Sequence, residues 1–241
     1  MPDDFFEDPR LAAVYDPLDP DRSDLDLYLA MLDEFAARSV LDIGCGTGTF
    51  ACLLAERGIE VIGLDPAGSS LDVARTKLGA DRVRWIHGDV TALPPLQVDL
   101  VTMTANVAQV FLTDDEWHQT LAGAHAALRP GGHLVFEIRD PSKEAWRNWT
   151  KDNSHTKADV PGIGLVEAWF DGAEAKGPLV TFSGTYIFHA DGTVLTPTST
   201  LRFRTRDEIE RSLAAAGFDL VDVRDAPDRP GLEFVFVAER P

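Results

Sequence analysis

The sequence has few cysteines, little positive charge and no long apolar run. Its 241 residues include two cysteines, and 40 acidic residues against 22 basic ones give a formal net charge of −18. Nucleic acids and anionic membranes are bound through basic surfaces, so this excess of negative charge argues against both as partners. No apolar run approaches the ~20 residues of a membrane-spanning helix, and the acidic N-terminus lacks a secretion-signal pattern. We therefore expect a cytoplasmic protein.

The two cysteines, Cys45 and Cys52, indicate neither a disulfide nor a metal site. If they lie on one loop and the helix that follows, helical rise separates them by up to roughly 10 Å, too far for a disulfide. Two histidines, His118 and His125, share a face of one expected helix, but no thiol or carboxylate cluster joins them. We expect free thiols, a reducing compartment and no bound metal.

One stretch, residues 40–50 (VLDIGCGTGTF), organises the chain. Its apolar beginning is typical of a strand buried in a parallel sheet. Glycines at 44, 46 and 48 permit a sharp turn and a close approach of a ligand to the backbone, and a helical pattern resumes at Phe50. A strand, a glycine turn and a helix together form a nucleotide-binding unit.

The glycine spacing leaves two classes of nucleotide open. The dinucleotide fingerprint is G-x-G-x-x-G, whereas this turn reads G-x-G-x-G with Thr49 at the position of the third glycine. Asp65, which ends the next apolar run, can accept hydrogen bonds from ribose hydroxyls, as in the dinucleotide case. At this point a nicotinamide-dependent oxidoreductase remains an alternative.

The order of patterns predicts an α/β fold with a doubly wound, mostly parallel sheet. Five short apolar runs alternate with helical patterns up to residue 139, which is typical of a parallel sheet. The final two strands, 218–224 and 233–238, are joined by a loop too short for a helical crossover, so the last strand should be antiparallel. Two capping boxes, at Thr113–Glu116 and Thr205–Glu208, predict where two helices begin.

Two segments do not follow this alternation. Residues 1–22 form an extended or partly helical lead-in. Residues 140–204 contain β-rich runs that flank Asp191-Gly192, which predicts an antiparallel hairpin, and Pro197 favours an edge or a bulge. We expect residues 140–204 to be an antiparallel insertion that covers the substrate, and residues 23–139 with 205–241 to form the cofactor-binding core.

The ordered motifs resemble the class I S-adenosylmethionine-dependent methyltransferases of small-molecule type. The matching segments are VLDIGCGTGTF at 40–50, VIGLDPAGSSLDVAR at 61–75, HGDVTAL at 87–93, VDLVTMTANVAQVF at 98–111, LRPGGHLVFE at 128–137 and AAAGFDLVDV at 214–223. The resemblance implies a Rossmann-like sheet of seven strands with the last one reversed, and S-adenosylmethionine as cofactor. Because this cofactor has no pyrophosphate, a glycine at position 49 is not needed.

The resemblance also implies cofactor-binding residues. The loop that holds the amino-acid end of the cofactor comprises Asp42, Gly44, Cys45, Gly46 and Gly48. The remaining expected contacts are Asp65 with Pro66 at the ribose, Asp89 with Val90 at the adenine, Asn106 at the methionine end, and Tyr15 as an N-terminal cover.

The substrate side is less defined by the sequence. Glu137 and Arg139 have the same parity near the end of the fifth strand, where they could accept a proton or orient an acidic substrate; a local ion pair is the alternative. His189 lies in the insertion and could meet a substrate, although a residue beside a hairpin turn is often simply exposed.

The expected function is methyl transfer to a nitrogen or oxygen of a small molecule, mainly by positioning. Beside the oxidoreductase, a second alternative is a protein that binds S-adenosylmethionine without catalysis. The acceptor, the methylated atom and the oligomeric state are left open by the sequence.

Overall fold

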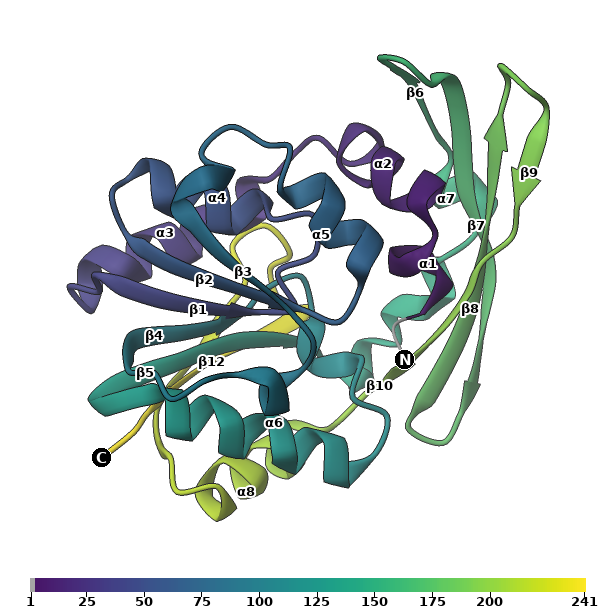
Figure 1. Ribbon diagram of the computed structural model, residues 1–241. Helices are drawn as coiled ribbons and strands as arrows, with labels where there is room; N and C mark the ends of the chain where they lie inside the picture. Colours follow the sequence, from purple (N-terminus) through teal and green to yellow (C-terminus); the bar gives the residue numbers. More distant parts are fainter. Residues whose placement is uncertain (1–2) are drawn as a thin grey trace.

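The computed structural model describes residues 3–241 and contains two β-sheets (Figure 1). The larger sheet has seven strands in the order β11-β12-β5-β4-β1-β2-β3. The second has five strands, with β10-β8-β7-β6 in order and β9 paired to β8. The seven-stranded sheet is the expected α/β core, and the second sheet lies within the expected insertion.

The core strands run over the stretches that the apolar pattern marks. Their bounds are β1 (Ser39–Ile43), β2 (Glu60–Asp65), β3 (Val83–His87), β4 (Val98–Met103), β5 (Leu128–Arg139), β11 (Asp219–Asp225) and β12 (Glu233–Glu239). Strands β1 to β5 are mutually parallel, whereas β12 pairs antiparallel with both β5 and β11. The predicted reversal of the last strand is confirmed.

Both faces of this sheet are buried, because successive side chains of each strand point to opposite sides. In β1, Val40 packs with α3 (Asp26–Glu34) and α4 (Thr49–Glu56), whereas Leu41 packs with α6 (Asp114–Ala127) and α8 (Arg206–Ala215). Both residues are fully buried. Figure 1 shows the two layers of helices on either side of the strands, so the sheet is doubly wound as expected.

Helix starts follow the sequence at α6 and α8 but not at α5 (Gly68–Ala74). Both predicted capping boxes form, at Thr113 and at Thr205. At the start of α5, Ser69 and Ser70 are of a residue type that often caps a helix, but neither does so. Instead Glu7 Oε2 accepts a hydrogen bond of 2.9 Å from Gly68 N, so the first turn of this helix is capped from the N-terminal segment.

Residues 130–132 (Pro-Gly-Gly) have a sequence typical of a turn, but in the structure they are part of a strand. Strand β5 begins at Leu128, and its register against β4 shifts between the pairs Val98–Leu128 and Leu100–His133. The Gly131 N–H donates to the Arg240 carbonyl at 2.6 Å. The turn-forming residues are therefore a bulge, because the C-terminal strand supplies hydrogen-bond partners that a free turn would lack.

The lead-in is helical and lies between the two sheets (Figure 1). It contains α1 (Asp4–Glu7) and α2 (Pro9–Leu18), which pack against α5 on one side and against β10 and β6 on the other. The Arg10 guanidinium forms an ion pair of 2.9 Å with Asp191 and lies 4.0 Å from the Phe188 ring centre. The segment thus joins the core to the second sheet.

The second sheet is larger than the predicted hairpin. It comprises β6 (Thr156–Val160), β7 (Gly164–Lys176), β8 (Leu179–Phe188), β9 (Thr193–Leu195) and β10 (Thr198–Arg202), preceded by the short helix α7 (Lys151–Ser154). The hairpin at Asp191-Gly192 is confirmed as β8 and β9, and Pro197 interrupts the run before β10, at the sheet edge. The sequence patterns did not reveal β6 or β7.

Candidate active site

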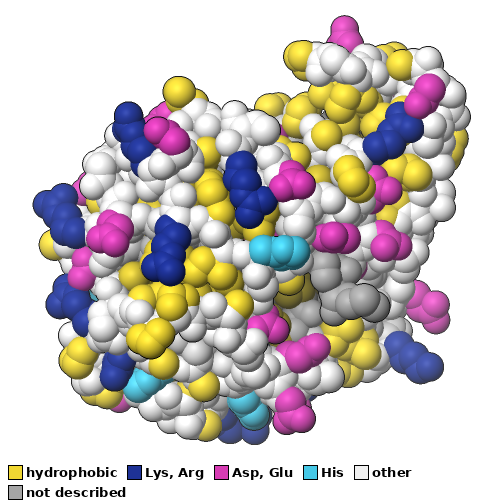
Figure 2. Space-filling view, viewed as in Figure 1, with side chains coloured by type: hydrophobic (Ala, Val, Ile, Leu, Met, Phe, Trp, Pro, Cys, Tyr) yellow, Lys and Arg dark blue, Asp and Glu magenta, His cyan; other side chains and the backbone are white. Residues whose placement is uncertain are grey.

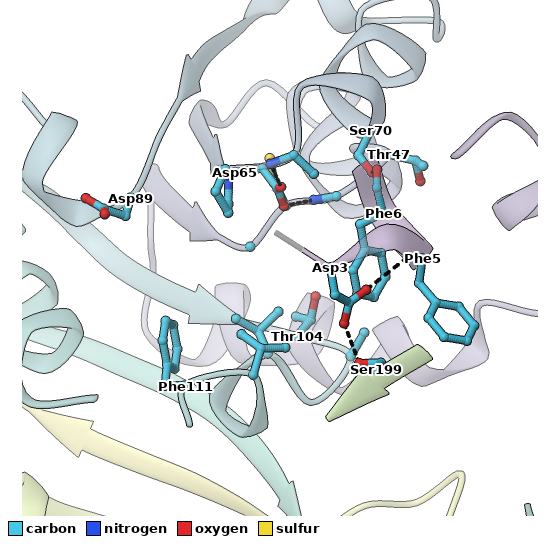
Figure 3. A pocket seen from close by; sticks show the side chains of 18 of the residues that line it. Asp3, Phe5, Phe6, Thr47, Asp65, Ser70, Asp89, Thr104, Phe111 and Ser199 are labelled. Atoms are coloured by element: carbon cyan, nitrogen blue, oxygen red, sulfur yellow. Dashed lines mark hydrogen bonds between the residues drawn. The ribbon is translucent and has the colours of Figure 1, made fainter. Parts of the chain in front are cut away.

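A cavity of about 510 Å³ lies at the carboxyl ends of β1, β2 and β4. This is where parallel α/β sheets bind ligands. Its floor comes from the loops after these strands, and its roof comes from α1, α2 and β10 (Figure 3). Figure 2 shows acidic side chains on the face between the body and the projecting second sheet.

The glycine loop presents bare backbone to the cavity. Gly44 and Gly46 line it with positive φ angles of 72° and 53°, as does the buried Cys45 between them. A Cβ on Gly44 would lie 2.6 Å from Val107, whereas a Cβ on Gly46 would meet nothing within 4 Å. Gly44 is therefore fixed by close packing, and the backbone at Gly46 is open to a ligand.

The third glycine of the loop serves packing rather than the cavity. Gly48 is the N-cap of α4 with φ of 76°, and it does not line the cavity. A Cβ at this position would lie 2.5 Å from the Trp85 ring and 2.8 Å from Ala74. Gly48 therefore allows α4 to pack closely, and its predicted contact with a cofactor stays a prediction.

Asp65 is fixed on the cavity floor at the end of β2. Its carboxylate accepts hydrogen bonds of 2.7 Å from Gly46 N and from Ala67 N, and the residue is 6% exposed. Burial raises the pKa of Asp65 despite these two N–H donors. Each oxygen retains a second lone pair, so the carboxylate can accept hydrogen bonds from ligand hydroxyls. Its neighbour Pro66 also lines the cavity.

Asp89 and Val90 form a further wall of the cavity. Asp89 is the N-cap of the short helix η3 (Val90–Ala92) and accepts hydrogen bonds from Thr91 N at 2.8 Å and Thr91 Oγ1 at 2.6 Å. These bonds lower the pKa of Asp89, so it is an anionic acceptor at neutral pH. Beside it, Val90 offers an apolar surface suited to a flat ring.

Besides Gly48, two expected cofactor residues, Asp42 and Asn106, do not line the cavity. Asp42 is 1% exposed beneath the loop, where it accepts a 2.8 Å hydrogen bond from Thr102 Oγ1 and burial raises its pKa to about 7. Asn106 has φ of 61°, and its Nδ2 lies 3.2 Å from Glu233 Oε1. Its neighbours Thr104, Ala105 and Val107 line the cavity in its place.

Tyr15 lines the cavity from α2, as the N-terminal cover requires. The next residue, Asp16, accepts hydrogen bonds from Thr47 Oγ1 at 2.8 Å and Thr49 Oγ1 at 3.1 Å, and lies 2.6 Å from Lys77 Nζ. These bonds hold α2 over the glycine loop.

The candidate catalytic residues on β5 lie outside the main cavity. Glu137 and Arg139 share the β5 face that packs toward α3, and Glu137 lines a separate cavity of about 20 Å³. Glu137 Oε1 accepts a 2.6 Å hydrogen bond from Asn106 N, and Arg139 NH1 donates to Gln109 Oε1 at 3.0 Å. Neither residue lines the main cavity, and their predicted approach to a substrate stays a prediction.

His189 is also distant from the cavity. It follows β8 on the far part of the second sheet, is exposed, and places Nε2 3.2 Å from Glu167 Oε2. His189 does not line the cavity, and its predicted substrate contact stays a prediction.

Sequence reasoning missed most of the roof. The roof lining includes Asp3, Phe5, Phe6, Ser199 and Thr200, and sequence reasoning also did not name Phe111 before α6 or Gln119 within α6. The aromatic pair Phe5-Phe6 in a strongly acidic lead-in was the available signal. The insertion that contains β10 was expected to cover the substrate, but its contact with the N-terminal segment has no local signal in the sequence.

The charges lining the cavity suit a cationic nucleoside ligand better than a pyrophosphate. The acidic lining residues are Asp3, Asp65, Asp89 and Glu116. Within residues 3–241, the only basic lining residue is Arg22, which is bonded to Asp24 at 3.0 Å. Carboxylates repel a pyrophosphate and attract a positive ligand. The acidic lining of the cavity therefore fits a nucleoside that carries a positively charged sulfur.

Comparison with known proteins agrees with this chemistry. A family model described as a methyltransferase domain matches residues 40–132. The cypemycin N-terminal methyltransferase of a Streptomyces species is 35% identical over 107 residues, which cover 44% of each chain. Residues 40–132 are therefore similar to a methyltransferase domain, in agreement with the resemblance of the sequence motifs. The matched stretch contains the glycine loop, Asp65 and Asp89, to which the motif resemblance assigns S-adenosylmethionine.

Solved methyltransferase structures show that this fold extends over nearly the whole chain. An S-adenosylmethionine-dependent methyltransferase from Clostridium acetobutylicum has a TM-score of 0.77 at 18% identity, covering 95% of this chain and 97% of that one. An amino pentose methyltransferase from Micromonospora echinaspora has a TM-score of 0.70 at 23% identity, covering 92% and 93%. In the sequence matches, by contrast, this chain spans about half the length of the first curated relatives, 44% to 57%.

Two features bear on the remaining expectations from the sequence. Among residues 3–241, every helix is too short or too polar to traverse a bilayer. The same residues hold no cluster of three or more His, Cys, Asp or Glu side chains arranged for a metal ion.

Proposed function

We propose that the protein transfers the methyl group of S-adenosylmethionine to a nitrogen or oxygen of a small molecule. The observation that carries this proposal is one continuous cavity with two ends. One end has the glycine loop, Asp65 and Asp89; the other lies under α1 and β10, beyond the expected cofactor residues. The second end gives space for an acceptor beside the cofactor.

The similar proteins support a small acceptor. One matching relative is an N-terminal methyltransferase for cypemycin, and one structural neighbour is an amino pentose methyltransferase. The first name describes methyl transfer to an N-terminus and the second to an amino pentose, and neither name mentions a nucleic acid. The roof in this chain covers the cavity from above, as suits a small substrate.

The expected mechanism depends on binding and orientation. When bound, S-adenosylmethionine supplies a methyl group activated by a positively charged sulfur. Asp65 and Asp89 would accept hydrogen bonds from the nucleoside, and the backbone at Gly46 would approach its amino-acid end. The roof formed by α1, α2 and β10 would exclude water and hold the acceptor in line, which are the main contributions to such a transfer.

The two alternatives are less well supported. A nicotinamide dinucleotide would place its pyrophosphate among carboxylates, with the paired Arg22 as the only basic lining residue within 3–241. A protein that only binds the cofactor would not need the second end of the cavity. Titration with NADH and a methyl-transfer assay test these alternatives separately.

Calorimetric titration with S-adenosylmethionine and S-adenosylhomocysteine tests the proposal. We expect binding by the unaltered protein and at least about tenfold weaker binding by Asp65→Ala, because charge-assisted hydrogen bonds are lost. The control is Asp72→Ala, which removes an exposed carboxylate of α5 outside the cavity. Absence of binding, or equal affinities for the two variants, would contradict the assignment.

A further inference from the structure

The roof end of the cavity has polar chemistry of its own. The Asp3 carboxylate accepts a 3.0 Å hydrogen bond from Phe5 N and a second one from the Ser199 hydroxyl of β10. Both Asp3 and Ser199 line the cavity, and Ser199 is only 4% exposed. The two partners are 196 positions apart in the sequence, so this carboxylate is held where two distant segments meet.

The cavity also contains a polar group without a hydrogen-bond partner among residues 3–241, the hydroxyl of Thr104. Thr104, which follows β4, is 7% exposed and lines the cavity. No hydrogen bond within residues 3–241 engages its hydroxyl, and Figure 3 shows the Thr104 hydroxyl turned toward the cavity. Because this hydroxyl opens onto the cavity, a ligand there can form a hydrogen bond with it.

The remaining walls of this end are aromatic. Phe6 and Tyr15 line the cavity from the same N-terminal segment as Asp3, and their ring centres are 6.0 Å apart. Phe111 lines the cavity on the Asp89 side (Figure 3). Aromatic faces and a carboxylate attract the same kind of ligand group, a cation attached to an apolar body. A neutral alcohol would gain much less from either.

We propose that this end of the cavity binds the methyl acceptor as an alkylammonium ion, with the Asp3 carboxylate as its counter-ion. This inference rests on the proposed function and adds its substrate class: an amine rather than an alcohol. The Thr104 hydroxyl is placed to accept or donate a further hydrogen bond to the acceptor. Asp65 and Asp89 belong to the cofactor end, so they do not account for the carboxylate of Asp3 in the roof. In this proposal Asp3 binds the acceptor.

The chemical step balances with the groups named. The ammonium first loses one proton, which the Asp3 carboxylate accepts and passes to solvent. The freed nitrogen lone pair forms the new bond to the methyl carbon, and the electron pair of the breaking carbon–sulfur bond stays on sulfur. The products are a methylated ammonium ion, S-adenosylhomocysteine and one released proton. Burial raises the pKa of Asp3, which suits it to accept this proton.

Matched pairs of amines and alcohols test the proposal. With S-adenosylhomocysteine saturating, calorimetry would measure the binding of benzylamine against benzyl alcohol, and of cyclohexylamine against cyclohexanol. We expect the unaltered protein to bind the amines about tenfold or more tightly, because only they form the charged pair. Equal binding of amines and alcohols, or no measurable amine binding, would overturn the inference.

The variant Asp3→Asn assigns the preference to this carboxylate. Asparagine caps a helix about as well as aspartate, so α1 should keep its N-cap while the charge is removed. We expect the amine preference to fall to about twofold or less, with unchanged affinity for S-adenosylhomocysteine. The control Asp4→Asn removes the neighbouring exposed charge and should retain the preference.

The outcomes separate this inference from the proposed function. If the unaltered protein does not bind S-adenosylhomocysteine, the proposed function fails. If it binds S-adenosylhomocysteine and Asp3→Asn keeps the full amine preference, the proposed function stands and the role of Asp3 is wrong.

Discussion

The buried carboxyl group of Glu137 leads to a prediction about stability: Glu137→Gln should stabilise the protein, and more so as pH rises. Glu137 is 5% exposed, and its Oε2 has no hydrogen-bond partner within residues 3–241. Burial, followed by the nearby charge of Glu233, raises the pKa of Glu137 from 4.5 to about 8. The folded protein therefore holds a proton here that the unfolded chain has released at neutral pH.

The direction and size follow from proton linkage. Because the folded pKa is the higher one, the contribution to stability is fully present below pH 4.5 and is lost as pH rises toward about 8. A difference of about 3.5 units at 1.36 kcal/mol each gives a total loss of about 5 kcal/mol. The loss amounts to about 1 kcal/mol at pH 5 and about 4 kcal/mol at pH 8.

Glutamine does not ionise, so the variant should escape this loss. Its side-chain oxygen can still accept the 2.6 Å hydrogen bond from Asn106 N. Asp42, whose pKa is also raised to about 7, is present in both proteins, so its titration cancels from the difference between them. The difference therefore isolates Glu137 from the other buried carboxyl group.

Urea unfolding of both proteins at several pH values between about 5 and 8 measures the effect. The free-energy difference between Glu137→Gln and the unaltered protein should widen by roughly 3 kcal/mol over this range. Glu174→Gln, at an exposed position of β7, should show no such widening. A difference that stays constant with pH would mean that Glu137 is already ionised in the folded protein, and the reasoning from its burial would be refuted.

Three further predictions concern packing, capping and the cover of the cavity. Gly48→Ala should lower the free energy of unfolding by about 1–3 kcal/mol in urea titrations, since its φ is 76° and its Cβ would lie 2.5 Å from Trp85. Thr113→Ala should cost about 1 kcal/mol in the same assay, because it removes the capping box of α6; no loss would contradict that role. Lys77→Met removes the 2.6 Å ion pair with Asp16 and should speed S-adenosylhomocysteine dissociation several-fold in stopped-flow measurements, while changing stability by less than about 1 kcal/mol. An unchanged dissociation rate would show that this pair does not hold the cover in place.

The core sheet was predictable because its information is local. Apolar runs of strand length, such as that around Val40, are buried in the structure with alternate residues on opposite faces. Both capping boxes and the reversed last strand also follow from short stretches of sequence. Asp65 and Asp89 reach the cavity because the carboxyl ends of parallel strands meet at one edge of the sheet.

Side-chain direction after a strand was not predictable in the same way. Ala105 and Asn106 both have positive φ angles, of 57° and 61°, in a conformation that non-glycine residues rarely adopt. This conformation accompanies the turning of Asn106 toward Glu137 and Glu233, away from the cavity. The motif predicts that Asn106 lies near the ligand. Glu137 and Glu233, the buried carboxylates that bind Asn106 in the structure, lie far from it in the sequence, so the motif around Asn106 gives no sign of them.

The roof was not predictable from local sequence because it is formed by contacts between segments that are far apart in the chain. Asp3 meets Ser199 of β10, Arg10 meets Asp191, and Glu7 caps a core helix at Gly68. Each contact joins the first ten residues to a segment far along the chain, so no window of sequence contains both partners. The cofactor end is built from the short-range pattern of β-strands and loops, whereas the acceptor end depends on this long-range closure. Under the proposed function, the family motifs correspond to the methyl-donor end of the cavity, and the N-terminal lead-in with the second sheet forms the end where we propose that the acceptor binds.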